Sequence, residues 1–188
     1  MAALFPRWAN APYAVALGLG ALIAACAVAA PMIFIRTPYG SDRNAPVVQP
    51  VGFDHRHHAR DDGIDCLYCH PGAERTASAG IPQTDVCMGC HGQVWPDSNE
   101  LAVVRASWAA GTAIPWKRVN ALPEHVYFNH AVHVHAGFPC ARCHGAVDDM
   151  ARVERVAPLT MGWCLDCHRE RQGDRRITPL TTCSACHR

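Results

Sequence analysis

The chain has 188 residues, with 17 Lys and Arg against 16 Asp and Glu, which gives a formal net charge of +1. Because the basic residues are scattered among acids and form no basic run, this balance argues against nucleic-acid binding. Aromatic residues make up only 7%, and Pro and Gly number 14 each. Beyond residue 45 long apolar periodic runs are few and strand signals nearly absent, so we predict a mostly helical and irregular fold.

The first segment with a clear signal is an apolar stretch at residues 14–35, which is 22 residues long and carries no charge. As a helix it would measure about 33 Å, enough to cross the hydrocarbon core of a bilayer. We predict a transmembrane anchor at 14–35, preceded by a short cytoplasmic N-terminus at 1–13 and followed by a linker at 36–50. Small residues four apart along the anchor favour close packing against other membrane subunits.

Two alternatives to an uncleaved anchor exist. A cleaved signal peptide usually has a shorter apolar region, and Pro31 is a poor residue after a cleavage point. The string Ile23-Ala24-Ala25-Cys26 resembles a bacterial lipobox, which would make Cys26 a lipidated N-terminus. However, the nine residues after Cys26 stay apolar, where a lipoprotein usually turns polar. The prediction is an uncleaved anchor in which Cys26 is a small buried residue.

The remainder of the chain contains the pattern Cys-x-x-Cys-His five times. This is the attachment signature of a c-type haem, in which two thiols form thioethers and the adjacent histidine becomes an axial iron ligand. One helical turn places both sulfurs along one haem edge and the next imidazole under the metal. The predicted attachment sites are Cys66 and Cys69, Cys87 and Cys90, Cys140 and Cys143, Cys164 and Cys167, and Cys183 and Cys186. The predicted proximal ligands are His70, His91, His144, His168 and His187.

Zinc and disulfides explain this pattern less well. Zinc ribbons need two Cys-x-x-Cys knuckles per metal, and five is an odd number. Disulfides could use ten cysteines in an oxidising compartment, but neither alternative explains a histidine after every second cysteine. We therefore predict five haem c groups in a domain at 51–188. With so much porphyrin in a modest domain, we expect this region not to fold without haem.

The haem domain also contains an internal duplication. The pattern Phe-x-His-x-x-His precedes the first motif at 53–58 and the third motif at 128–133, and two haem motifs follow each copy. The repeat therefore spans 51–91 and 126–168, with a fifth haem site at 183–187. Histidines three apart lie on one helical face, near each other but aimed at different irons. The predicted distal ligands are His55, His58, His130 and His133.

This set leaves one haem without a distal ligand. Met150 lies fourteen residues before Cys164, near the spacing of the other distal ligands, so it could complete the fourth haem. Met161 is a less favoured choice because it lies only three residues before the same cysteine. The further candidates are His57, His125 and His135.

Residues 92–127 form the longest stretch without a haem motif. Asp97 or Ser98 can cap a helix that ends before Gly111. The apolar face of this helix is predicted to hold Leu101, Val104 and Trp108. An extended arm follows at 113–123. We expect this insert to be either a docking surface for a partner subunit or a lid over haem faces.

The Phe-x-His-x-x-His spacing resembles that of the class III cytochromes c, the c3 and c7 group. In that group the first histidine of the pair closes the haem just downstream, and the second reaches a neighbouring haem. The resemblance implies that His55 serves the first haem and His130 the third. By the same resemblance, His58 and His133 serve two of the others.

The whole layout resembles the pentahaem cytochrome c subunit of alternative complex III, a bacterial quinol-oxidising membrane complex. The resemblance rests on the single N-terminal span, on 53–58 and on the strings at 81–91, 122–130 and 161–168. It implies an electron-transfer relay in the bacterial cytoplasmic membrane, with the haem domain on the periplasmic side. The partners it implies are an iron–sulfur subunit, quinol-binding integral membrane subunits, and a monohaem cytochrome c or a terminal oxidase.

All five motifs are regular, and enough histidines and methionines exist to complete every iron. No open iron position is therefore expected, and we predict that the chain is not itself an enzyme. Two other classes are weighed against the relay. One is a stand-alone membrane-anchored quinol dehydrogenase that feeds a periplasmic reductase. The other is a nitrite or hydroxylamine reductase, which would show a high-spin haem.

Overall fold

The computed structural model describes residues 6–171 and 181–187. The chain divides into two compact units, Met1–Arg43 and Asn44–Arg188. Within the described ranges no β-strand is present, and an isolated antiparallel bridge joins Val126 to His187. The predicted helical and irregular fold class is confirmed.

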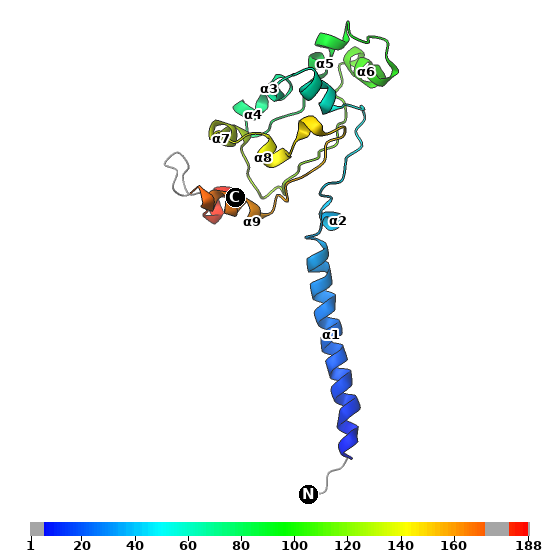
Figure 1. Ribbon diagram of the computed structural model, residues 1–188, viewed down its shortest axis with the longest axis vertical. Helices are drawn as coiled ribbons and strands as arrows, with labels where there is room; N and C mark the ends of the chain where they lie inside the picture. Colours follow the sequence, from blue (N-terminus) through cyan, green and yellow to red (C-terminus); the bar gives the residue numbers. More distant parts are fainter. Residues whose placement is uncertain (1–5, 172–180, 188) are drawn as a thin grey trace. The chain divides into compact units, whose positions relative to one another are not determined.

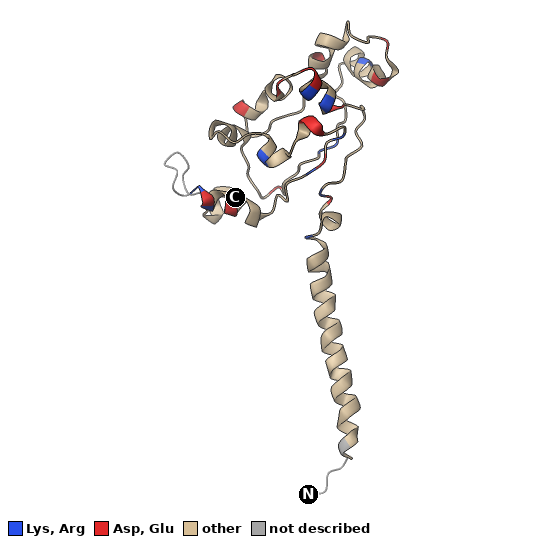
Figure 2. Cartoon of the chain, viewed as in Figure 1, with Lys and Arg blue, Asp and Glu red and all other residues tan. Residues whose placement is uncertain are grey.

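The first unit is built around α1, Asn10–Phe34, a helix of 25 residues with a mean hydropathy of 2.2 in its most apolar window. At 1.5 Å per residue it is about 37 Å long. Figure 2 shows it without a charged residue along its length. By length and composition α1 can cross a membrane. It begins four residues before the predicted span, because Pro12 is tolerated in the first turn of a helix.

A short helix, α2, Pro38–Ser41, follows α1. The Thr37 hydroxyl caps it by accepting a hydrogen bond from the Gly40 N–H at 3.3 Å. The compact second unit then begins at Asn44, inside the segment predicted as a linker. The Asn44 N–H donates to the Arg155 carbonyl at 2.9 Å, and the Val47 N–H donates to the Val153 carbonyl at 3.2 Å.

The second unit consists of short helices joined by irregular segments (Figure 1). Five of these helices carry the haem motifs. They are α3, Cys66–Cys69; α5, Thr84–His91; α8, Ala141–His144; α9, Met161–Glu170; and α10, Cys183–Cys186. Local caps favour these turns: Asp65 Oδ1 accepts from the Leu67 N–H at 2.8 Å, and Thr160 Oγ1 accepts from the Trp163 N–H at 3.3 Å.

The remaining helices hold the motif turns against one another. They are the π-helix η2, Arg56–Asp61; α4, Gly72–Arg75; the 3-10 helix η3, Asn99–Leu101; α6, Ala102–Ala110; α7, His130–His135; and the 3-10 helix η4, Val147–Asp149. Helices α4 and α7 lie side by side (Figure 1). Their contact is fixed by main-chain hydrogen bonds from His130 N to Ala77 O at 3.2 Å and from Ala131 N to Thr76 O at 3.1 Å.

The helix predicted in the insert is confirmed. Ser98 caps η3 by accepting from the Glu100 N–H at 3.3 Å, and η3 runs directly into α6. Gly111 ends α6 with a φ of 63°, a conformation that glycine adopts without a steric penalty. The Thr84 and Ser107 hydroxyls form a hydrogen bond of 2.7 Å that joins α5 to α6.

The aliphatic core is small and lies beside α6. Val51, Val104 and Ile114 form its buried cluster, and Leu101 and Trp116 pack against it. Trp108, one helical turn after Val104 in α6, has an exposed fraction of 53%. Each buried aliphatic side chain contributes about 1.5–3 kcal/mol, whereas ordering one residue costs about 1–2 kcal/mol. A cluster of this size cannot order the second unit by itself.

We therefore predict that the second unit requires haem to fold. When the full chain is exported without the machinery that attaches haem c, near-UV circular dichroism should show no fixed tertiary structure, and trypsin should digest the region after residue 44 rapidly. The matched control is the same chain matured with haem, which should resist the protease. A haem-free chain that is as resistant as the control would contradict this prediction.

Candidate haem-binding sites

The structure places histidines opposite one another in pairs. In four pairs a motif histidine faces a histidine from another part of the chain, with ring centroids 5.6–6.3 Å apart. They are His91 with His58 at 6.1 Å, His144 with His130 at 6.3 Å, His168 with His133 at 6.1 Å, and His187 with His125 at 5.6 Å. Two metal–nitrogen bonds of about 2 Å, together with about 1 Å from each nitrogen to its ring centre, require about 6 Å. The spacing fits one iron between each pair.

The remaining motif histidine, His70, lies close to His55. Burial lowers the pKa of His55 to about 4, and the charge of His70 is the next largest cause. Burial likewise lowers the pKa of His144, followed by the effect of its partner His130. Both neutral imidazoles are in the state that a metal ligand requires. The structure thus brings four motif histidines face to face with a partner histidine and places His55 near the fifth, His70.

The assignment of Met150 needs correction. His133 already occupies the place opposite His168, where the sequence analysis put Met150. The Met150 methyl group instead lies at the end of the third motif, 3.3 Å from where a Cβ on Gly145 would be. Met161, the less favoured choice, begins α9 with an exposed fraction of 65%.

The histidine that completes the fifth pair is His125, which the sequence analysis left among the further candidates. It lies in a turn closed by the hydrogen bond from Val126 N to Pro123 O and has no Phe-x-His-x-x-His context, so local spacing gives no reason to prefer it. The signal is tertiary: the chain pairs Val126 with His187 in an isolated bridge, and this brings the two rings together. Counting the histidines needed for five motifs could have pointed to it.

The other two candidates have different contacts. His57 stacks on Trp95 with centroids 6.1 Å apart, and its ring nitrogens lie 4.0 Å from Asp61 and 3.6 Å from Asp62. His135 places Nε2 3.0 Å from the Glu74 carbonyl oxygen. Neither faces a motif histidine.

The two Phe-x-His-x-x-His copies have the same geometry. The Phe53 ring meets His55 edge-on at 4.7 Å and stacks on His58 at 4.3 Å. The Phe128 ring repeats these contacts with His130 at 4.8 Å and with His133 at 4.4 Å. Each phenylalanine thus holds two imidazoles at a large angle to one another, so that they can serve different irons.

Backbone carbonyls orient most of the paired imidazoles. Six of them, among the residues that the structure describes, place Nδ1 within 2.8–3.1 Å of a carbonyl oxygen. These contacts join His58 to Asp54, His70 to Gly80, His91 to Val94, His130 to Ala77, His133 to Asn129, and His187 to His125. When the Nδ1–H donates to a carbonyl, Nε2 is the nitrogen left to bind a metal.

Three imidazoles depart from this rule. His144 Nδ1 lies 3.2 Å from the Asn120 side-chain amide. The Nδ1 atoms of His55 and His168 are buried and make no hydrogen bond to any residue within 6–171 and 181–187. The hydrogen-bonding of the paired histidines therefore varies from site to site, and this is a means by which a protein tunes otherwise similar irons.

The thiols show which motif turns are neighbours. Burial, and then the neighbouring Cys140 thiol, raises the pKa of Cys66. Burial, and then a neighbouring thiol, likewise raises the pKa of three further thiols: Cys69 beside Cys90, Cys143 beside Cys167, and Cys164 beside Cys186. The first motif thus lies near the second and the third, the third near the fourth, and the fourth near the fifth.

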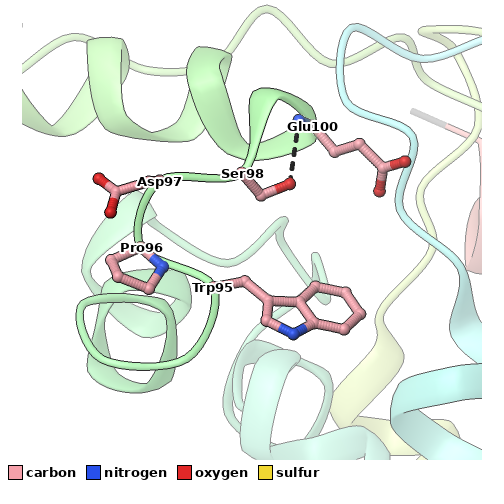
Figure 3. A pocket seen from close by; sticks show the side chains of 5 residues that line it. All are labelled: Trp95, Pro96, Asp97, Ser98 and Glu100. Atoms are coloured by element: carbon pink, nitrogen blue, oxygen red, sulfur yellow. Dashed lines mark hydrogen bonds between the residues drawn. The ribbon is translucent and has the colours of Figure 1, made fainter.

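The hollow in Figure 3 lies outside these pairs. It has a volume of about 530 Å³ and is lined by Trp95, Pro96, Asp97, Ser98 and Glu100. Trp95 has a φ of 53°, which is unusual for a bulky residue. It directly follows Val94, whose carbonyl holds His91. The hollow is therefore part of the turn that orients the second motif histidine.

The motif turns and their facing imidazoles define the second unit as a multihaem cytochrome c domain with covalently bound haem. Comparison with known proteins agrees: residues 126–188 match the family of cytochrome c7 and related cytochrome c.

One relative is the multiheme cytochrome c subunit of menaquinone reductase from Nitratidesulfovibrio vulgaris (strain Hildenborough). It is 35% identical over 97 residues, which is 51% of this chain and 45% of that protein. The chain thus aligns with about half the length of this curated relative.

The ring angles predict two kinds of low-spin iron in the haem-loaded protein. Nearly parallel ligand planes give a rhombic electron paramagnetic resonance signal, whereas nearly perpendicular planes give a strongly anisotropic one. The interplanar angles are 6° for His130 with His144, 22° for His125 with His187, 64° for His58 with His91, and 82° for His133 with His168. Spectra of the oxidised protein should contain both signals, and a single uniform signal would contradict the pairing.

Proposed function

We propose that this chain is an electron-transfer relay that carries five haem c groups, each held between two histidines. The observation that carries the proposal is that all five motif histidines have a partner imidazole, four of them at the spacing that an iron between two rings requires. When bound, haem c supplies reversible one-electron chemistry.

In this proposal the ten motif cysteines fix the porphyrins, and the motif histidines are the proximal ligands. The distal ligands are His55, His58, His130, His133 and His125 for the first, second, third, fourth and fifth motifs. Met150 is no longer assigned to iron. Two strong nitrogen ligands at every iron leave no position for a substrate, so the chain exchanges electrons without catalysing a reaction itself.

We propose that electrons pass through the motifs in the order second, first, third, fourth and fifth, in either direction. The neighbouring attachment thiols support this order, and so does the packing of α4 against α7. Helix α4 follows the first motif, and α7 carries His130, the partner of the third motif histidine, so this contact holds two successive sites together. The second and fifth motifs are then the ends of the relay.

We further propose that α1 anchors the chain in the bacterial cytoplasmic membrane, with the haem domain on the periplasmic side, as a subunit of a complex that reacts with quinones. Alternative complex III is the form that the sequence resemblance favours, with an iron–sulfur subunit, quinol-binding membrane subunits and a monohaem cytochrome c or a terminal oxidase as partners. The apolar length of α1 and the attachment of haem c outside the cytoplasm support this arrangement.

A second candidate has the opposite direction of electron flow. The relative from Nitratidesulfovibrio vulgaris is named as a subunit of a menaquinone reductase, and a similar role here would deliver electrons to a quinone. The relay and its ligands are the same in both cases, and only the partners decide the direction.

The ligand set predicts that His125 completes the fifth iron and that Met150, which the sequence analysis placed at the fourth iron, binds none. In the haem-loaded chain, His125→Ala should make about one fifth of the iron five-coordinate and high-spin, and this fraction should bind carbon monoxide after reduction. The matched control, Met150→Leu, nearly preserves side-chain volume and should leave all the iron low-spin. The reverse result for the two variants would restore methionine ligation.

The proposed assembly predicts that the full chain, purified with an affinity tag from its own membranes in mild detergent, brings large integral membrane subunits with it. If the chain belongs to a complex of the alternative complex III type, added quinol should then reduce the haems of that complex. In a quinone reductase, added quinone should reoxidise haems that an artificial donor has reduced. A chain that purifies alone and is reduced by quinol directly would instead be a stand-alone quinol dehydrogenase.

A further inference from the structure

We propose that Asn120 is a positioning residue for His144 and that its side-chain oxygen sets the reduction potential of the third haem. The inference rests on the proposed ligand set, because it takes His144 as an iron ligand, and it goes beyond that set by giving the arm at 113–123 a specific role.

The contact is between the Asn120 amide and His144 Nδ1, which are 3.2 Å apart. Both residues are half-buried, so water competes only partly for the hydrogen bond. Asn120 precedes the third motif by twenty residues and reaches it from the end of the arm.

The chemistry of the pair fixes the orientation of the amide. If Nε2 of His144 binds iron, Nδ1 carries the proton and can only donate. The amide nitrogen is also only a donor, so the Asn120 oxygen must face the imidazole. Amide oxygen and nitrogen have nearly the same shape and are assigned from the hydrogen bonds they make. We therefore place Asn120 Oδ1 on Nδ1–H.

Among the described residues, the hydrogen bond at His144 Nδ1 comes from the Asn120 side chain and not from a backbone carbonyl, whereas a carbonyl holds its partner His130 and another holds the equivalent motif histidine of the first half, His70. Asn120 takes the place that a main-chain group fills at those sites. An acceptor on Nδ1–H makes the imidazole a more basic ligand, which stabilises the oxidised iron and lowers the reduction potential. The third haem should therefore depend on a replaceable side chain.

The test is a redox titration of the purified haem-loaded protein or its complex, followed by electron paramagnetic resonance. The third iron belongs to the rhombic class, because its ligand rings are nearly parallel at 6°, so the shift should appear in the rhombic signal. Asn120→Leu removes the acceptor and should shift the reduction equilibrium of this haem about three- to tenfold toward the reduced form. A tenfold shift corresponds to about 59 mV for one electron. Asn120→Asp keeps the size of the side chain and supplies a stronger acceptor, so it should shift the same haem in the opposite direction.

The matched control is the same substitution, Asn99→Leu, at an exposed asparagine in η3. Asn99 is neither a proposed ligand nor one of the groups that orient a ligand, so no potential should change.

If Asn120→Leu fails to mature, Asn120→Asp decides the question alone. Unchanged potentials in both variants, or in the aspartate variant when the leucine variant does not mature, would overturn the inference. Failure of the ligand set is distinguishable, because wild-type protein would then show a third iron that is high-spin or bound by methionine before any variant is made.

Discussion

An imidazole that is held at Nδ1 can present Nε2 in only one direction, and the cytochrome unit depends on this constraint. Two rings can share an iron only if both Nε2 atoms point to the same place while the ring centres lie about 6 Å apart. The chain holds six of the ten paired rings with backbone carbonyls, and four of these carbonyls lie within ten residues of the histidine. Gly80 and Val94, for example, follow their motif histidines by only ten and three residues. Irregular backbone is therefore suited to this task, since its carbonyls are not used in sheets or long helices.

The duplicated halves show what is fixed and what varies. Phe53 and Phe128 make nearly the same contacts with their histidine pairs. Both halves therefore use the same local packing to hold two imidazoles at a large angle to one another. The hydrogen bonds around the rings are not repeated. His55 Nδ1 has no hydrogen bond, whereas its counterpart His130 binds the Ala77 carbonyl. Duplicated sites with different surroundings can differ in potential while their ligands stay the same.

The small aliphatic core follows from the same design. Apart from a cluster that joins α5, α6 and the insert, the described residues bury few apolar side chains, and none of these is fully buried. The second unit instead brings imidazoles together in pairs. The prediction that folding needs haem follows from this, as in other small domains whose order depends on a metal site.

The sequence by itself determined the chemistry, because a covalent haem site is a local pattern: two thiols and an imidazole on one helical turn. It also predicted the fold class, the apolar helix, the cap and end of α6, and the duplication, all of which depend on neighbours within a few residues. It did not give a facing histidine for every motif. Local spacing gave no reason to choose His125, and only the tertiary structure brings it to His187, since the bridge between Val126 and His187 joins segments sixty-one residues apart. The sequence also did not predict the exposure of Trp108 or the role of Asn120. Contacts between residues that are distant in sequence depend on the tertiary fold.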